Sequence, residues 1–147
     1  MRTLAVIPAR LGATRLPRKP LRLLAGLPLV LRVWQRVSET AVAERVVIAT
    51  DSDEVAAIAT AAGAEVIMTS ASHASGTERV AEVARLPEFA TYDVIINVQG
   101  DEPFVSRQAL VGATRMVTDG GYGVGTAAVP ATPDILGNPN VVKVVAA

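Results

Sequence analysis

Two segments of this sequence concentrate side chains that could bind phosphate groups and a metal ion. The first, residues 8–20, places four cations (Arg10, Arg15, Arg18 and Lys19) among three prolines and one glycine. The guanidinium groups of arginine and the ammonium group of lysine bind phosphate oxygens, and prolines restrict the loop that carries them, so the segment suits a polyphosphate. The alternative is a solvated surface loop whose arginines pair with nearby carboxylates. Because the segment directly follows an apolar strand pattern, phosphate binding is favoured.

The second segment, residues 97–103 (NVQGDEP), carries neighbouring carboxylates, Asp101 and Glu102, just after an apolar strand pattern. Gly100 beside them would allow another stretch of backbone to approach closely. Magnesium typically takes one or two protein carboxylates and lets phosphates supply other ligands, so Asp101 is a candidate Mg²⁺ ligand. The alternative is that Asp101 or Glu102 only caps the next helix. With the cations, this segment predicts a site for a nucleoside triphosphate and its metal ion.

A third segment, residues 73–79 (HASGTER), has the pattern of a helix start. Ser75 and Glu78 stand three residues apart, the spacing of a capping box. Gly76 in the first turn leaves backbone N–H groups accessible to a ligand, and Arg79 lies one turn further on. We interpret His73, the only histidine of the sequence, as a loop hydrogen-bonding residue rather than a catalytic base.

These segments must be positioned by strands and helices that alternate along the chain. We expect a first strand at 4–7 that ends at Pro8. Further strands are expected at 46–49, 65–68, 93–98, 124–129 and 141–145, and helices at 27–40, 51–63, 75–86 and 106–117, with Asp51 and Glu54 capping the second helix. This alternation predicts an α/β fold with a mostly parallel sheet flanked by helices. Ligands bind beyond the carboxyl ends of such strands, where the first two segments lie.

Composition narrows the class of protein. The 147 residues suit one domain, and 50% hydrophobic residues exclude general disorder. Lys+Arg and Asp+Glu both number 14, so no cationic field exists to hold nucleic acid or an anionic membrane non-specifically. The absence of cysteine excludes disulfides, thiolate zinc sites and cysteine nucleophiles. With no signal-peptide or membrane-span pattern, we expect a cytoplasmic protein.

The sequence closely resembles the 3-deoxy-manno-octulosonate (Kdo) cytidylyltransferases, the CMP-Kdo synthetases of bacterial lipopolysaccharide biosynthesis. The resemblance rests on five segments in the family's order, at 7–21 (IPARLGATRLPRKPL), 49–56 (ATDSDEVA), 72–83 (SHASGTERVAEV), 97–103 (NVQGDEP) and 138–145 (NPNVVKVV). It implies a Rossmann-like nucleotidyltransferase fold. The sequence departs from the family at Arg18, where glycine is usual, and at Leu11-Gly12, where an aromatic-small pair is common. The first departure bears on the course of the phosphate loop.

The resemblance implies a transferase reaction and roles for several residues. The anomeric hydroxyl of Kdo would attack the α-phosphorus of CTP, and pyrophosphate would leave. Arg10, Arg15 and Lys19 would hold the triphosphate and stabilise the departing pyrophosphate. Asp101 would bind Mg²⁺, which polarises the α-phosphate. Positioning and charge neutralisation would supply most of the rate enhancement.

The resemblance also implies a nucleotide pocket and one sugar contact. Gln99 would face the sugar. Backbone groups of the pocket would read the Watson–Crick edge of the base and so separate cytosine from uracil. The implied nucleotide-binding residues are Pro8, Ala9, Arg10, Lys19, Ala74, Ser75, Gly76 and Arg79.

Two alternatives to the Kdo enzyme remain open. One is a sialic-acid cytidylyltransferase, although that loop usually continues with a Gly-Gly-Ser-Lys run where this chain has residues 13–17 (ATRLP). The other is a nucleotide-binding module without turnover. An arginine-rich nucleic-acid binder is disfavoured by the zero net charge and the 3% aromatic content.

The family's chain continues beyond the valine-rich segment where this sequence stops. We therefore expect residues 1–147 to be the N-terminal, CTP-binding portion of a single cytidylyltransferase domain, truncated and inactive by itself. Members of the family are typically homodimers, so we expect the full-length protein to be one, with CTP and Kdo as its substrates and neither nucleic acid nor membrane as a partner.

Overall fold

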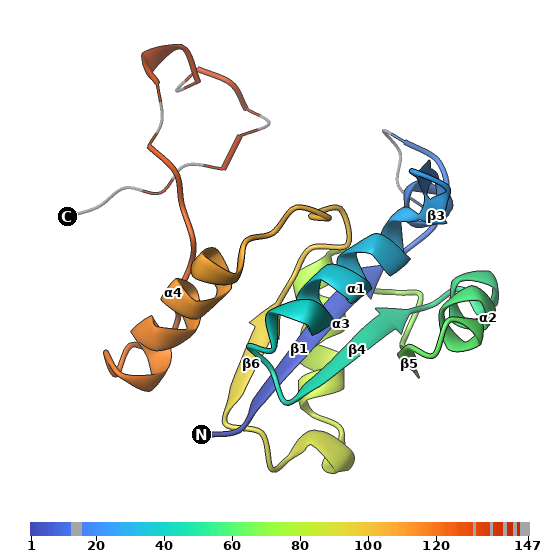
Figure 1. Cartoon of the computed structure of the whole chain (residues 1–147), viewed down its shortest axis with the longest axis horizontal. Coiled ribbons are helices and arrows are strands. Elements are labelled where there is room, and N and C mark those ends of the chain that lie inside the picture. Colours follow the sequence, from blue (N-terminus) through green and yellow to red (C-terminus); the bar gives the residue numbers. More distant parts are fainter. Residues whose placement is uncertain (13–15, 131, 136, 140, 143, 145–147) are drawn as a thin grey trace.

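The chain forms a parallel β-sheet with helices on both faces (Figure 1). The computed structural model describes residues 1–12, 16–130, 132–135, 137–139, 141, 142 and 144. The strands of the main sheet are β1 (Thr3–Ala9), β4 (Arg45–Thr50), β5 (Glu65–Met68) and β6 (Val94–Asn97), in the order β5-β4-β1-β6. The chain winds outward from β1 to β5 and then returns to the other side of β1. The predicted α/β class and parallel sheet are confirmed.

The order of the strands creates a switch point between β1 and β6. From β1 the chain moves to β4 on one side, and β6 later pairs with β1 on the other side. Helices that connect the two halves of such a sheet lie on opposite faces, which leaves a crevice at the carboxyl ends of the two central strands. The cation-rich segment at residues 8–20 and the acidic segment at residues 97–103 both lie at this crevice.

The prediction that Pro8 ends the first strand is wrong. β1 continues through Pro8, which lies opposite Ala49, to Ala9. The pairing of β1 with β6 stops earlier, at Val6, whose carbonyl accepts from the N–H of Val98 at 3.1 Å. Since residues two apart in a strand present their backbone groups to the same side, Pro8 faces the side where the ladder has already ended. Its missing N–H therefore costs no sheet hydrogen bond.

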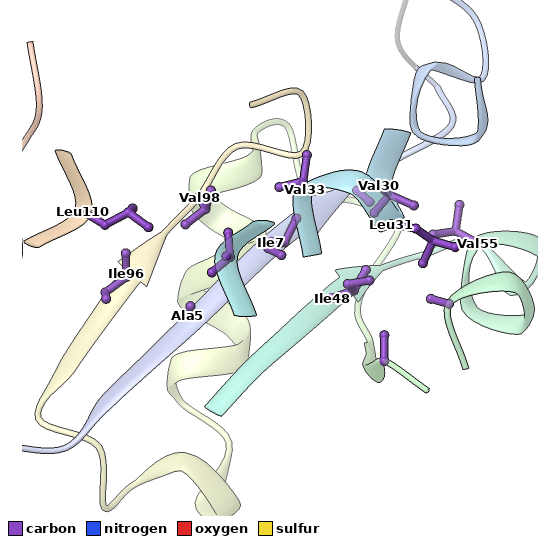
Figure 2. Packing of buried hydrophobic residues seen from close by; sticks show 14 of the residues in the cluster. Ala5, Ile7, Val30, Leu31, Val33, Ile48, Val55, Ile96, Val98 and Leu110 are labelled. Atoms are coloured by element: carbon purple, nitrogen blue, oxygen red, sulfur yellow. The ribbon is translucent and has the colours of Figure 1, made fainter. Parts of the chain in front are cut away.

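Helices α1 (Leu29–Thr40), α2 (Asp53–Ala61) and α4 (Arg107–Thr118) contribute to the larger of two buried clusters, on one face of the sheet. Alternate residues of β1, including Ala5 and Ile7, point into this cluster. Figure 2 shows Ile7 and Ile48 of the sheet beside Val30 and Val33 of α1. Although few residues are aromatic, aliphatic side chains thus form a packed core.

The opposite face is covered by α3 (Gly76–Ala84). Val80 and Val83 of this helix pack with Leu4 and Val6 of β1 and with Phe89. Because Leu4 and Val6 alternate with Ala5 and Ile7, β1 is buried on both faces, as expected for a central parallel strand. Helix α3 therefore approaches the crevice from the side opposite α1.

Serine residues cap three of the helices. The hydroxyls of Ser52, Ser75 and Ser106 accept hydrogen bonds from the backbone N–H three residues on, at the starts of α2, α3 and α4. The prediction that Asp51 caps α2 is wrong by one residue, because the Asp51 carboxylate is turned toward Arg79 instead. The helix expected at 51–63 ends at Ala61, and Gly63, with φ of 86°, follows it.

A small hairpin precedes α1. Strands β2 (Leu23–Leu24) and β3 (Leu27–Pro28) pair antiparallel around Ala25 and Gly26, which have φ of 49° and 79°. The helix predicted from residue 27 therefore starts at Leu29. Short 3₁₀ turns span Lys19–Leu21, Pro87–Phe89 and Pro133–Ile135.

The expectation of a strand at 124–129 is wrong. These residues follow α4 and run away from the sheet (Figure 1), and no described strand lies beside them to pair with. A β-branched run becomes a strand only where a partner satisfies its backbone. For the strand expected at 141–145, positions 143 and 145 lie outside the described residues, and 141, 142 and 144 are not in a strand. No helix in the described part of the chain has the length and hydropathy needed to cross a membrane.

Candidate functional site

A cleft of about 260 Å³ opens at the switch point between β1 and β6. Its walls come from the end of β1 and the loop after it, the 3₁₀ turn that follows, the first turns of α3 and the loop after β6. The lining residues are Pro8, Ala9, Arg10, Lys19, Pro20, Gly76, Arg79, Gln99, Gly100 and Asp101. The cleft is thus lined by residues from all three segments that the sequence singles out, at 8–20, 73–79 and 97–103.

Two glycines allow the walls of this cleft to meet. A Cβ atom at Gly100 would lie 2.6 Å from the carbonyl oxygen of Pro8, closer than any side chain tolerates. A Cβ atom at Gly76 would lie 3.1 Å from Cγ of Pro8 and 3.7 Å from Oε1 of Gln99. The predicted close backbone approach at Gly100 is confirmed, and it sets the distance between the loop after β6 and β1.

Arg10 is an exposed cation with an uncharged partner. Its Nη1 donates to the backbone carbonyl of Ala74 at 3.3 Å. This hydrogen bond joins the loop after β1 to the loop before α3, and no carboxylate among the described residues pairs with the guanidinium. Arg10 is therefore equipped to attract an anion into the cleft.

Lys19 and Asp101 form an ion pair between Nζ and Oδ2. Asp101 does not cap a helix, because Ser106 caps α4, and the side chain of Glu102 is exposed. The described residues contain no group of three or more histidine, cysteine, aspartate or glutamate side chains that could hold a metal ion together. A single carboxylate in a cationic cleft fits a metal such as Mg²⁺, which can take its other ligands from phosphates and water.

Arg79 lies at the buried side of the cleft, with the residue only 1% exposed. Its Nη2 is 3.2 Å from Oδ2 of Asp51, and its Nη1 donates to Oγ1 of Thr69. A guanidinium this deeply buried needs such partners, since an uncompensated buried charge is costly. Arg79 therefore differs from Arg10 in carrying a compensated charge.

The loop before α3 is tied to the helix by several side chains. Ser75 accepts from the N–H of Glu78 at 3.2 Å, and a carboxylate oxygen of Glu78 accepts from the N–H of Ala74 at 2.8 Å, close to the predicted capping box. His73 hydrogen-bonds to Glu82, in keeping with its predicted structural role. That bond, together with the N–H of Ser70, holds the pKa of Glu82 below its ordinary value.

Arg18 occupies a backbone conformation that favours glycine. Its φ and ψ are 58° and 28°, in the left-handed region, and its guanidinium pairs with Glu54 of α2. The carbonyl of Arg18 accepts from the N–H of Leu21 at 3.0 Å and so starts the turn that carries Lys19. The turn is thus formed with an arginine at this position.

Most of the predicted site residues meet in the cleft. Pro8, Ala9, Arg10, Lys19, Gly76, Arg79, Gln99 and Asp101 line it. Ala74 and Ser75 do not, although Ala74 holds Arg10 and Ser75 caps α3. Arg15 lies outside the described residues.

Pro20 lines the cleft although it was not among the site residues predicted from the sequence. Asp51 and Thr69, which bind Arg79, were not among them either. Asp51 directly follows β4 and Thr69 directly follows β5. Applied to every strand, the rule that ligands gather at the carboxyl ends of parallel strands could have found both.

The fold and cleft together define a Rossmann-like α/β protein of the nucleotidyltransferase type, with cations and a carboxylate at its switch point. A family model described as cytidylyltransferase matches residues 4–147, and the chain belongs to this family.

Relatives by sequence agree with this family. The 3-deoxy-manno-octulosonate cytidylyltransferase of Gemmatimonas aurantiaca is 62% identical over all of this chain, and that of Cellvibrio japonicus is 46% identical over 96% of it. The chain spans 57% and 56% of the length of these two relatives.

Solved structures resemble the chain as well. The CMP:2-keto-3-deoxy-manno-octonic acid synthetase complexed with CTP is 36% identical, with a TM-score of 0.74 over 81% of this chain and 48% of that one. A Mycobacterium tuberculosis protein solved with manganese is 19% identical, with a TM-score of 0.55 over 82% of this chain and 60% of that one, a likeness of fold alone.

Proposed function

We propose that the protein transfers CMP from CTP to the anomeric hydroxyl of Kdo and releases pyrophosphate, a step of lipopolysaccharide biosynthesis. One observation carries the proposal most directly: the cleft at the switch point is lined by Arg10, Lys19, Arg79 and Asp101. The 62% identity to a Kdo cytidylyltransferase over the whole chain supports the same reaction.

The charges of the cleft indicate which residues bind the phosphates of the nucleotide and which face its base. Arg10 pairs with no carboxylate in the described part of the chain, and the half-exposed Lys19 can leave Asp101 for a phosphate oxygen, so these two cations bind the triphosphate. Arg15 is proposed as a third phosphate ligand of the same loop. Arg79, whose charge is compensated by Asp51, faces the uncharged base. Pro8, Ala9 and the Ala74–Gly76 turn complete the base pocket.

The proposed reaction requires little covalent participation from the protein. The hydroxyl oxygen of the sugar forms a bond to the α-phosphorus and gives up its proton to water. The bond from that phosphorus to the bridging oxygen breaks, and pyrophosphate leaves with the electron pair of that bond. Arg10 and Lys19 stabilise the negative charge that develops on the leaving group. Gln99, which lines the cleft and is exposed, orients the sugar.

Asp101 is the residue that would hold the metal ion, which we propose to be Mg²⁺. When bound, such an ion polarises the phosphate that is attacked. Before the nucleotide arrives, Lys19 neutralises the Asp101 carboxylate and so keeps an unpaired charge out of the cleft. We further propose that this chain supplies the CTP-binding portion of the domain, with other parts of the sugar pocket contributed elsewhere.

Three broader features belong to the proposal. The location is the cytoplasm, the working unit is a homodimer, and neither nucleic acid nor a membrane takes part. The homodimer is proposed because the resemblance to the Kdo cytidylyltransferases implies it. Light scattering on the purified protein measures the mass, and a monomer would remove the dimer from the proposal.

The test is a substrate comparison in the complete gene product. Pyrophosphate release is measured with CTP and Mg²⁺ together with Kdo, with N-acetylneuraminate, or with no sugar. We expect release that depends on Kdo. Release only with N-acetylneuraminate would identify a sialic-acid enzyme, and CTP binding without release with either sugar would indicate a nucleotide-binding module.

A further inference from the structure

Arg79 is the only charged residue among the buried residues that the structure describes. Two groups hold its terminal nitrogens: Oδ2 of Asp51 lies 3.2 Å from Nη2, and Oγ1 of Thr69 accepts from Nη1. A planar guanidinium held at two of its nitrogens has little freedom to rotate. Its position in the wall of the cleft is therefore set by residues outside the cleft.

The two partners of Arg79 come from the far half of the sheet. Asp51 follows β4 and Thr69 follows β5, whereas the cleft lies between β1 and β6. The N–H of Thr69 donates to the carbonyl of Thr50 at 2.9 Å, which links the two strand ends. Arg79 thus connects strand ends that do not line the cleft with a wall that does.

We propose that Asp51, assisted by Thr69, is a positioning residue that fixes Arg79 for recognition of the nucleotide base. The inference rests on the proposed function, in that it takes the ligand of the cleft to be CTP. Asp51 also compensates the charge of Arg79, so this end of the cleft suits an uncharged ring better than a phosphate. Arg10, bound to a neutral carbonyl, keeps the charge that a phosphate needs.

The chemistry of the base explains why the position of Arg79 matters. A guanidinium only donates hydrogen bonds. Cytosine presents two neighbouring acceptors, O2 and N3, whereas uracil carries a hydrogen on N3. A firmly held Arg79 therefore favours cytosine, and a loosely held one loses this preference.

The test compares Asp51→Asn with Asp53→Asn in the complete gene product. Both variants remove one negative charge, but Asp53 is exposed at the start of α2 and lines no part of the cleft. Calorimetry measures the binding of CTP, UTP and inorganic triphosphate, and circular dichroism checks folding. For Asp51→Asn we expect CTP affinity to fall roughly tenfold or more, because a buried charge loses its partner. The preference for CTP over UTP should fall with it, while triphosphate affinity is retained or rises, because Arg79 then lines the cleft without the Asp51 charge. Asp53→Asn should match the parent.

Thr69→Val and Thr69→Ser test whether Thr69 positions Arg79 or only supports folding. Valine removes the hydroxyl that binds Arg79, whereas serine keeps it, so we expect a weaker CTP preference only with valine. An unchanged ratio of CTP to UTP affinity in a folded Asp51→Asn variant would overturn the proposal. If Asp51→Asn does not fold, an unchanged ratio in Thr69→Val overturns it instead. A parent protein that binds triphosphate without preferring CTP would refute the proposed function, a result distinct from both.

Discussion

The Lys19 ammonium group and the Asp101 carboxylate form an ion pair that joins the loop after β1 to the loop after β6. Their side chains are 36% and 46% exposed, so the pair contributes little to stability by itself, on the order of 0–1 kcal/mol. A weak pair is easily exchanged for stronger partners. The arrangement therefore keeps the proposed phosphate ligand and the proposed metal ligand side by side in the cleft.

In Asp101→Asn, added Mg²⁺ should no longer raise turnover, while CTP binding is largely retained. The amide cannot provide the charged oxygen that Mg²⁺ prefers, but Arg10 and the released Lys19 still attract phosphate. Turnover is measured as a function of Mg²⁺ concentration, and CTP affinity by calorimetry. Glu102→Gln is the matched control. If Asp101→Asn responds to Mg²⁺ as the parent does, another carboxylate binds the metal ion.

Lys19→Ala should lower turnover by a factor on the order of 10²–10³, because it removes a preorganised charge from the leaving pyrophosphate. The free energy of unfolding should change by less than about 1 kcal/mol, since an exposed pair is all that is lost. Arg22→Ala, which removes an exposed cation outside the cleft, serves as the control. Near-normal pyrophosphate release by Lys19→Ala would exclude Lys19 from the mechanism.

Gly100→Ala should destabilise the fold by about 1–3 kcal/mol, the usual cost of overpacking. Its new Cβ would lie 2.6 Å from the carbonyl oxygen of Pro8, so the loop bearing Asp101 must move away from β1. Gly112→Ala is the counterpart: it lies within α4 with nothing within 4 Å, and should stabilise by roughly 0.5–1 kcal/mol. Urea denaturation measures both, and equal stability of the two variants would contradict the close approach.

Arg18→Gly should leave stability within about 1 kcal/mol of the parent, because glycine relieves the left-handed conformation at φ of 58° but loses the exposed pair with Glu54. Arg18→Ala keeps the unfavourable conformation and loses the pair, so it should be the less stable variant. Thermal unfolding compares the two. The reverse order would show that the backbone at this position is not strained.

Stability should depend on the titration of Glu82. Its pKa is lowered from an ordinary 4.5, first by the hydrogen bond to His73 and then by the N–H of Ser70. A lowered pKa means that the charged form stabilises the fold above pH 4.5 and that this contribution is lost as the pH falls through the lower folded value. The stability advantage of the parent over Glu82→Gln should therefore shrink below pH 4.5.

The control for this prediction is Glu88→Gln, which removes an exposed carboxylate six positions further along the chain. Urea denaturation of the parent and both variants is followed between neutral and acidic pH. An advantage over Glu82→Gln that is constant across this range would show that the carboxylate of Glu82 does not stabilise the fold through its charge.

The sequence by itself determined the alternation of strands and helices and the segments that carry the chemistry. The four strands of the main sheet and the helices that begin after Ser75 and Ser106 were predictable, because hydrophobic periodicity and capping are local properties. The rule that ligands bind beyond parallel strands also predicts Arg10 and Asp101 in one site, and both line the same cleft.

Only the tertiary structure decided which partners these residues have. Pro8 could remain within β1 because β6 had already ended beside it, and the run at 124–129 forms no strand because no described strand pairs with it. The same holds for Arg79, whose partners Asp51 and Thr69 lie 28 and 10 residues away in the sequence. Pairing, burial and charge compensation depend on segments that are distant along the chain, so a local pattern cannot determine them.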